Sequence, residues 1–154
     1  HYRILPDPHH GLILHEIPEQ ESTYKLCRIN EKITVKGGHI QLNLHDGKNI
    51  LIRVNNPQDP KEDKYKRMDV LKISIPDQEI LQTLPFGKEN YAIIMDGKNI
   101  GQVGKIINIT KRFGPNASTV SIEHDGVQTE TLYDYTFIIG EADQPEINLP
   151  ESRI

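Results

Sequence analysis

The segment from Asp96 to Arg112, with the sequence DGKNIGQVGKIINITKR, combines glycines and basic residues in a pattern suited to binding an anion. Glycines at positions 97, 101 and 104 let the chain turn tightly, adopt positive φ or approach a partner closely. Basic side chains can neutralise phosphates, and side-chain or backbone amides can donate hydrogen bonds to phosphate, sugar or base. The segment therefore predicts a phosphate-binding surface whose contacts are Lys98, Asn99, Gly101, Lys105, Lys111 and Arg112.

Two further groups of basic residues extend this candidate surface. One lies at 25–36, where four basic residues accompany a single acid. The other lies in the polar stretch 55–67, which is longer than most loops of a compact domain, and loops of this kind often bind a partner. An ordinary solvated surface is the alternative for both groups, since most charged residues simply face water. The candidate contacts in the two groups are Lys25, Arg28, Lys36, Lys64, Tyr65, Lys66 and Arg67.

Two aromatic residues, Tyr65 and Phe113, lie beside basic residues and are candidates for base stacking. Aromatic side chains at the edge of a small barrel more often belong to the core, and this alternative is open for both. Stacking requires an exposed ring, whereas core packing requires a buried one.

Residues for catalysis or metal binding are not grouped in a convincing pattern. His9, His10 and His15 are close in sequence, but no cysteine or carboxylate set has ligand spacing around them. The His-Asp pairs at 45–46 and 124–125 fall at expected turns, where aspartate is favoured. The motifs GxxxxGK[ST], GxSxG and HExxH do not occur. The sequence therefore predicts no enzyme, no metal site, no cofactor and no small-molecule substrate.

The composition of the 154-residue chain favours a soluble protein made of β-strands. The net charge is −4, the single cysteine excludes an internal disulfide, and no apolar run approaches the roughly 18 residues of a membrane-spanning helix. The chain has 22 isoleucines and only three alanines. Since β-branched residues fit a pleated sheet and alanine is the best helix former, the expected fold class is all-β.

Alternating apolar and polar residues locate the clearest strands. The alternation over 39–54 is interrupted at Asp46-Gly47, which predicts a β-hairpin closed by a two-residue primed turn. Further strands are expected at 32–36, at 70–75 and at 91–95. Within 70–75, alternate residues ending at Ile75 are expected on one face of the strand. Cys27 lies on another expected strand and is predicted to belong to the hydrophobic core.

These elements divide the chain into a β domain at 1–85, a small barrel at 86–140 and an extended tail at 141–154. The first part has twelve basic and twelve acidic residues, the second has five and six, and the tail has one and four. In the barrel all five basic residues precede Phe113, and the four acids that follow it have no basic counterpart. One edge of the barrel is therefore expected to be positive and the opposite side negative.

The glycine-rich segment resembles the KOW motif, a loop and strand found in SH3-like barrels of ribosomal proteins and transcription elongation factors. The resemblance widens to the archaeal and eukaryotic small-subunit ribosomal protein S4e family, whose motifs occur here in the same order over essentially the whole chain. They are YKLCR at 24–28, KGG at 36–38, HD at 45–46, DVLKISIP at 69–76, GKNIGQVGKI at 97–106, TKR at 110–112 and FIIG at 137–140. In PEINLP at 145–150, Glu146 stands where the family commonly has an aromatic residue, which argues against stacking by the tail.

The resemblance implies a central β domain followed by a KOW barrel and a tail, and an S4-type RNA-binding domain that would precede His1. It implies a structural, non-catalytic constituent of the small ribosomal subunit in the cytoplasm, which binds and stabilises ribosomal RNA. Neighbouring small-subunit ribosomal proteins would be its other partners, with no membrane partner and a monomeric state off the ribosome. The alternative is a KOW-type domain of a transcription elongation or antitermination factor, whose partner would be polymerase or another protein.

Overall fold

The computed structural model describes residues 1–112, 114, 117–141, 144–147 and 149. Over these residues the chain is all-β, as predicted, apart from two short 3-10 helices, η1 (Glu19–Thr23) and η2 (Tyr133–Tyr135). The strands in this part of the chain are β1 (Tyr2–Asp7), β2 (Gly11–Glu16), β3 (Tyr24–Val35), β4 (His39–Leu44), β5 (Asn49–Ile52), β6 (Val70–Ser74), β7 (Ile80–Leu84), β8 (Tyr91–Ile94), β9 (Val103–Thr110), β10 (Thr119–His124), β11 (Val127–Leu132), β12 (Thr136–Glu141) and β13 (Gln144–Pro145).

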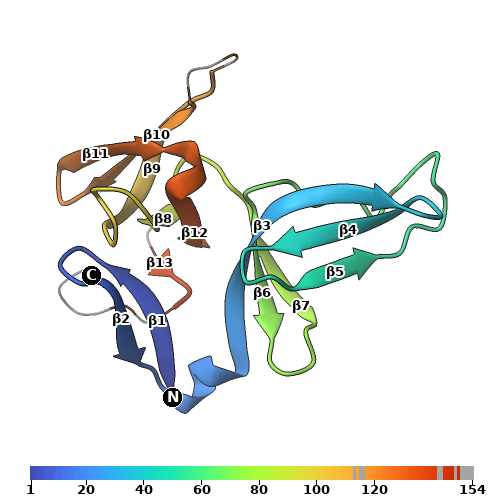
Figure 1. Ribbon diagram of the computed structural model, residues 1–154, viewed down its shortest axis with the longest axis horizontal. Helices are drawn as coiled ribbons and strands as arrows, with labels where there is room; N and C mark the ends of the chain where they lie inside the picture. Colours follow the sequence, from blue (N-terminus) through green and yellow to red (C-terminus); the bar gives the residue numbers. More distant parts are fainter. Residues whose placement is uncertain (113, 115–116, 142–143, 148, 150–154) are drawn as a thin grey trace.

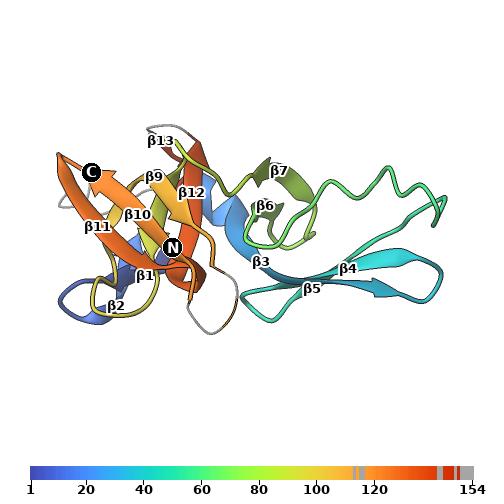
Figure 2. The same ribbon diagram turned by 90° about the horizontal axis from the view of Figure 1, so that it is seen from above.

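The strands form three antiparallel sheets. β1 and β2 make an N-terminal hairpin, the central sheet has the order β5-β4-β3-β6-β7, and the barrel sheet has the order β11-β10-β9-β8-β12-β13. The barrel sheet curls around its own core (Figure 1). The outer part of the central sheet extends away from the barrel, as Figure 2 shows from above.

Strand β3 joins the two parts of the central sheet. Residues 24–28 pair with β6 and residues 29–35 pair with β4, with a register shift between Ile29 and Glu31. The run 26–29 is buried because neighbouring elements cover both of its faces, whereas the run 30–34 is exposed. One strand therefore leads from the interior of the protein to its outer end.

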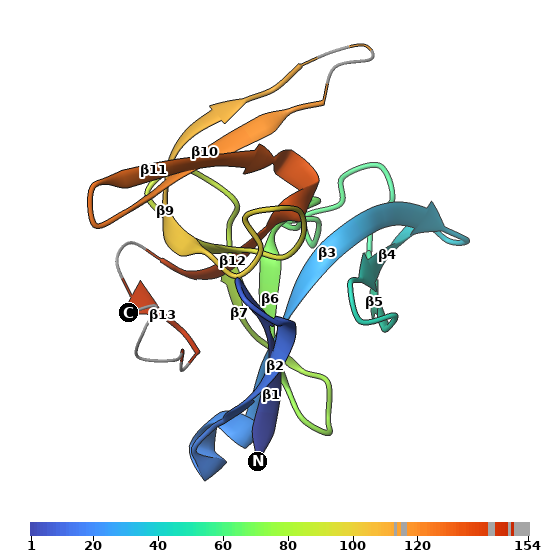
Figure 3. The same ribbon diagram turned by 60° about the vertical axis from the view of Figure 1, so that its left-hand side comes forward.

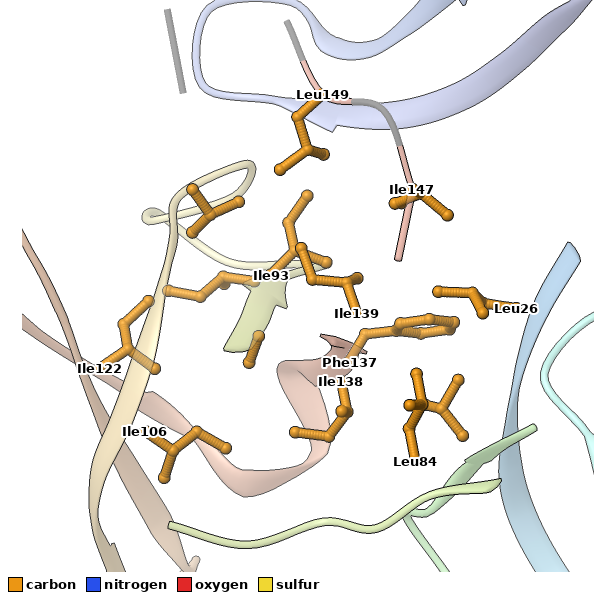
Figure 4. Packing of buried hydrophobic residues seen from close by; sticks show 14 of the residues in the cluster. Leu26, Leu84, Ile93, Ile106, Ile122, Phe137, Ile138, Ile139, Ile147 and Leu149 are labelled. Carbon is orange, nitrogen blue, oxygen red and sulfur yellow. The ribbon is translucent and has the colours of Figure 1, made fainter. Parts of the chain in front are cut away.

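The larger hydrophobic cluster fills the barrel sheet and continues into the central sheet (Figure 4). Isoleucines of β8, β9, β10 and β12 meet inside the curl. Leu26, Val70 and Leu84 of the central sheet belong to the same cluster. Because burial of one such side chain stabilises a fold by roughly 1.5–3 kcal/mol, this packing holds the two sheets together.

A smaller cluster lies on the other face of the central sheet and includes Cys27, Leu42 and Leu71. Successive residues of β6 alternate between the clusters, Val70 in the larger and Leu71 in the smaller, as a strand period of two requires. Cys27 is fully buried, which confirms its predicted place in the core. Burial raises the pKa of its thiol to about 12.

The predicted hairpin at 39–54 is confirmed as β4 and β5, but its turn is one residue longer than expected. The Leu44 amide donates to the Lys48 carbonyl at 2.9 Å and the Gly47 amide donates to the Leu44 carbonyl at 3.1 Å. Within this three-residue loop only Gly47 has positive φ, at +89°. The prediction of a two-residue primed turn was wrong. Asp46 stabilises the longer loop, because its carboxylate accepts a hydrogen bond from the Lys48 amide and forms an ion pair with Lys25.

The other expected strands are present in the second half of β3, in β6 and in β8. Ile75 departs from the predicted common face and is 45% exposed, because β6 ends at Ser74.

The N-terminal hairpin packs on the barrel sheet, an arrangement that the sequence pattern does not predict. Leu5 of β1 is buried in the larger cluster and Ile13 of β2 packs against it. At the other end of the chain, Ile147 and Leu149 of the predicted tail are buried in the same cluster, so these two residues belong to the core. The boundaries 1–85, 86–140 and 141–154 stay a prediction about independent folding units.

Candidate functional site

The glycines of the β8–β9 connection and of β9 allow close packing inside the protein. Gly101 is buried and has a φ of +86°. A Cβ at this position would lie 2.5 Å from Pro8 Cδ in the N-terminal hairpin, and one at Gly104 would lie 2.6 Å from the Glu123 carbonyl oxygen. The Gly101 amide donates to the Ile94 carbonyl at 2.8 Å. The Gly101 backbone is therefore already used by the hairpin and by β8, and the expected phosphate contact at Gly101 stays a prediction.

Two other candidates from the same connection differ in their surroundings. The Asn99 side-chain amide donates to the Glu130 carbonyl at 3.3 Å, which ties the connection to β11. Lys98 is exposed and has no ion pair with any side chain in the described part of the chain. Lys98 is therefore open to a ligand, whereas Asn99 is partly occupied.

The basic residues of the glycine-rich segment do not form one surface. Lys98 lies before β9 and the exposed Lys111 and Arg112 lie after it, so the eight residues of the strand separate them by roughly 25 Å. Lys105 lies within β9, where its ammonium is 3.3 Å from the Glu89 carboxylate. The single positive edge expected for the barrel is therefore not formed, because the segment runs along a strand from one end of the sheet to the other.

Lys25 forms an ion pair with Asp46 beside the β4–β5 turn. The hydrogen bond to Asp46 raises the pKa of Lys25. Burial opposes ionisation of Asp46, but the bonds from Lys25 and from the Lys48 amide lower its pKa overall. Lys25 is therefore already neutralised by a carboxylate and has less to gain from a phosphate.

Arg28 lies inside the protein at the junction between the two large sheets. It is only 9% exposed. Its guanidinium donates to the Asp134 and Thr136 carbonyls, both at 2.8 Å, and to Asn30 Oδ1 at 2.9 Å. The side chain joins the central sheet to η2 and β12, and the expected RNA contact at Arg28 stays a prediction.

The remaining basic candidates lie on the outer part of the central sheet. Lys36 is exposed in the β3–β4 turn, and Lys64 and Lys66 are exposed in the loop 55–67. Arg67 donates to the Asn30 carbonyl at 2.9 Å and to the Asp134 carboxylate at 3.1 Å. The first three cations are open to a ligand, whereas Arg67 has partners within the protein.

Tyr65 is half-buried and packs against the smaller hydrophobic cluster. Its ring is part of the packing under the loop, so the core alternative describes it better than stacking. Phe113, the other stacking candidate, lies outside the described residues.

Three exposed cations near these candidates were missed: Lys48 follows the β4–β5 turn, Arg53 follows β5, and Lys61 lies in the loop. In the described part of the chain none of the three has an ion pair. No motif marks them. The available signal was the predicted hairpin itself, because pairing its strands brings the end of β5 next to the start of β4.

The histidines do not gather at one point. His10 Nδ1 lies 2.8 Å from Asp7 Oδ2 in the turn of the N-terminal hairpin. Among the described residues there is no group of three His, Cys, Asp or Glu side chains placed to hold a metal ion. The same residues contain no helix with the length and apolar character needed to cross a membrane.

In the comparison with protein families, the model described as Ribosomal family S4e matches residues 1–80. Curated proteins with similar sequences include the small ribosomal subunit protein eS4 of Desulfurococcus amylolyticus, which is 49% identical over 152 residues, or 98% of this chain. The protein of the same name from Aeropyrum pernix is 48% identical over 97% of this chain. The chain spans 60% and 59% of the length of these two relatives.

A similar solved structure is that of the 30S ribosomal protein S4e from Thermoplasma acidophilum. Its TM-score is 0.75 and its sequence identity is 28%, over 94% of this chain and 68% of that one. The similarity therefore includes the N-terminal hairpin, the central sheet and the barrel sheet.

Proposed function

The chain belongs to Ribosomal family S4e, whose model matches more than half of it, and we propose that it is a structural, non-catalytic constituent of the small ribosomal subunit. In this role it binds and stabilises ribosomal RNA in the cytoplasm. Its partners are small-subunit ribosomal RNA and neighbouring small-subunit proteins. It acts without a cofactor, a small-molecule substrate or a membrane, and is a monomer off the ribosome.

One observation carries this proposal: proteins named small ribosomal subunit protein eS4 are nearly half identical to this chain over almost its whole length. The region aligned at this level of identity spans both large sheets. The relatives therefore share the scaffold and much of the surface. A shared surface supports a shared partner.

The alternative, a KOW-type domain of a transcription elongation or antitermination factor, is less well supported. A KOW barrel alone would account for the second half of the chain and leave the central sheet unexplained. The same relatives match both halves.

The proposed RNA contacts fall into two classes. Exposed cations without an ion pair in the described part of the chain are ready to neutralise phosphates, and those among the predicted contacts are Lys36, Lys64, Lys66, Lys98, Lys111 and Arg112. Lys25, Arg67 and Lys105 each pair with a carboxylate and would have to exchange it for a phosphate. The second class therefore contributes less to RNA affinity.

A filter-binding comparison tests this proposal. The full chain is titrated with small-subunit ribosomal RNA and, separately, with large-subunit ribosomal RNA from the same organism, at fixed salt and with excess transfer RNA as competitor. We expect at least tenfold tighter binding to the small-subunit RNA. Equal binding to both RNAs would contradict a specific role in the small subunit.

A further inference from the structure

We infer that residues 30–67, here called the arm, bind the phosphate backbone of double-stranded RNA, and that the β10–β11 end of the barrel faces away from that RNA. The arm consists of the outer half of β3, strands β4 and β5, and the loop 55–67. The inference rests on the proposed function because it takes RNA as the partner. It adds which surface meets the RNA and which form of RNA that surface fits.

The arm is positive although the protein as a whole is negative. It contains eight lysines and arginines against five aspartates and glutamates, a net charge of +3. The rest of the chain contains ten basic and seventeen acidic residues, a net charge of −7. A phosphate backbone is therefore attracted to the arm and repelled by most of the remaining surface.

Three of the five acidic residues of the arm have partners other than its free cations, whereas Asp59 and Glu62 lie in the loop among the lysines. Asp63 pairs with Lys32 at 2.9 Å, Asp46 pairs with Lys25 from outside the arm, and Glu31 accepts the Asn43 amide at 3.2 Å. Six cations are exposed and have no ion pair within the described residues: Lys36, Lys48, Arg53, Lys61, Lys64 and Lys66.

Strand pairing gathers two of these cations at the outer end of the arm. Val35 pairs with His39, and His39 Nδ1 accepts the Val54 amide at 2.9 Å. Lys36 and Arg53, the neighbours of Val35 and Val54, therefore lie about two strand spacings apart, or roughly 10 Å.

The loop 55–67 adds its lysines to the same surface. A Cβ on Gly38 would lie 2.5 Å from Pro57 Cβ, so the start of the loop packs against the β3–β4 turn. Figures 1 and 2 both show the loop returning along the sheet from this end toward β6. The loop lysines therefore continue the row that begins at the outer end.

The loop is held in place by the sheet beneath it. The Lys32 ammonium donates to the Asp63 carboxylate at 2.9 Å and to the Tyr65 carbonyl at 3.0 Å. The Tyr65 ring packs on the smaller cluster, and Arg67 closes the loop against the Asn30 carbonyl at 2.9 Å. Because these bonds fix the loop before RNA arrives, less conformational entropy is lost on binding than for a free loop.

The form of RNA follows from what the arm lacks. Proteins that bind single-stranded RNA stack bases on exposed aromatic rings, whereas double-stranded RNA is bound mainly through its backbone and shape. Tyr65 is the single Phe, Trp or Tyr among residues 30–67, and its half-buried ring packs against the smaller cluster. An arm with free cations and no stacking platform fits a duplex backbone.

The opposite end of the molecule is acidic. The β10–β11 hairpin carries Glu123, Asp125 and Glu130 and no lysine or arginine. Figures 1 and 3 show the turn of this hairpin pointing away from the arm. This end repels phosphate, so the charge distribution orients the protein with the arm toward the duplex.

Two triple variants of the full chain test the inference. K36A/R53A/K64A removes three arm cations, and the matched control K98A/K111A/R112A removes two lysines and one arginine from the barrel. The probes are a 20-base-pair RNA duplex of mixed sequence and a 20-nucleotide oligouridine, titrated at several salt concentrations. Since the log-log salt slope changes by up to about 0.9 per lost phosphate contact, we expect the arm variant to lower the duplex slope by two to three units and weaken binding at least tenfold. The barrel variant also removes proposed RNA contacts, so it is expected to weaken duplex binding as well, but by a smaller factor than the arm variant.

The outcomes separate this inference from the proposed function. Equal or greater loss in the barrel variant, or tighter binding of oligouridine than of the duplex, overturns the inference while RNA binding by the protein stands. If the unaltered chain binds neither small-subunit ribosomal RNA nor the duplex, the proposed function is overturned together with the inference. Loss of folding is excluded as the cause of weaker duplex binding if two controls hold. The melting temperatures of both variants lie within about 2 °C of the parent, and K36R/R53K/K64R retains duplex affinity.

Discussion

Replacing Arg28 with alanine is expected to destabilise the junction between the central sheet and the barrel sheet. The guanidinium makes three hydrogen bonds of 2.8–2.9 Å, two of them to main-chain carbonyls of the barrel. Hydrogen bonds to a charged group contribute about 1.5–3 kcal/mol each, and a buried acceptor left without a donor keeps its desolvation cost. The Asn30 bond lies nearest to solvent and adds least, so we expect a total loss of about 3 kcal/mol.

Urea unfolding followed by circular dichroism measures this loss. The midpoint should fall at an unchanged m value, because the variant alters stability and leaves the surface exposed on unfolding the same. For a chain of this length 1 kcal/mol corresponds to about 2–4 °C, so the melting temperature should drop by roughly 6–12 °C.

R67A is the matched control for Arg28. Arg67 pairs with the same residue, Asp134, but the two side chains are 54% and 66% exposed. Exposed ion pairs contribute about 0–1 kcal/mol, so R67A should change stability by less than 1 kcal/mol. A loss below 1 kcal/mol in R28A, or a reduced salt slope of RNA binding in R28A at unchanged stability, would refute the structural role assigned to Arg28.

Further predictions concern other buried or constrained positions. G101A should destabilise the protein by about 2 kcal/mol more than G47A in thermal unfolding, because both positions have similar positive φ but only the first has neighbours within reach of a Cβ; equal losses would contradict the packing role. Although His45 is exposed as a residue, partial desolvation of its ring, whose centroid lies 5.0 Å from that of Phe137, lowers its pKa. The unfolded state therefore binds more protons below pH 6.5, and stability should fall as the pH drops through that range; H45N should flatten this dependence, and an unchanged pH profile would count against it. Cys27, with its raised pKa and complete burial, should resist iodoacetamide at pH 8 until urea unfolds the chain; rapid labelling of the native protein would show that the site opens.

The sequence located strands well where one face is buried and the other is solvated. β4 is the clearest case, because its residues alternate between the smaller cluster and solvent. The N-terminal hairpin was missed for the opposite reason. Ile4 and Leu14 are 65% and 70% exposed while Leu5 is buried, so both faces of the hairpin are apolar and the alternation disappears.

The candidate site was predicted less well, because the partners of its residues are distant in sequence. The positive φ of Gly101 could be expected from its type, but its neighbour Pro8 belongs to the other end of the chain. Arg28 has the sequence environment of a surface cation on a strand, yet it donates to main-chain carbonyls at 134 and 136. Every residue has a main-chain carbonyl, so the sequence does not show which carbonyls accept a hydrogen bond from an arginine. Sequence patterns therefore could not distinguish a buried arginine from one that binds phosphate.

A protein that braces folded RNA needs stiffness as well as affinity, and the junction supplies it. Leu26 and Leu84 pack into the barrel cluster from the central sheet, and Arg28 adds directional bonds across the same boundary. Apolar packing alone is non-directional and tolerates sliding, whereas hydrogen bonds to two specific carbonyls fix the angle between the sheets. An RNA duplex held by the arm would therefore be fixed in orientation relative to the barrel. Under the proposed function, the buried basic residue sets the orientation at the junction and the exposed cations of the arm bind the RNA.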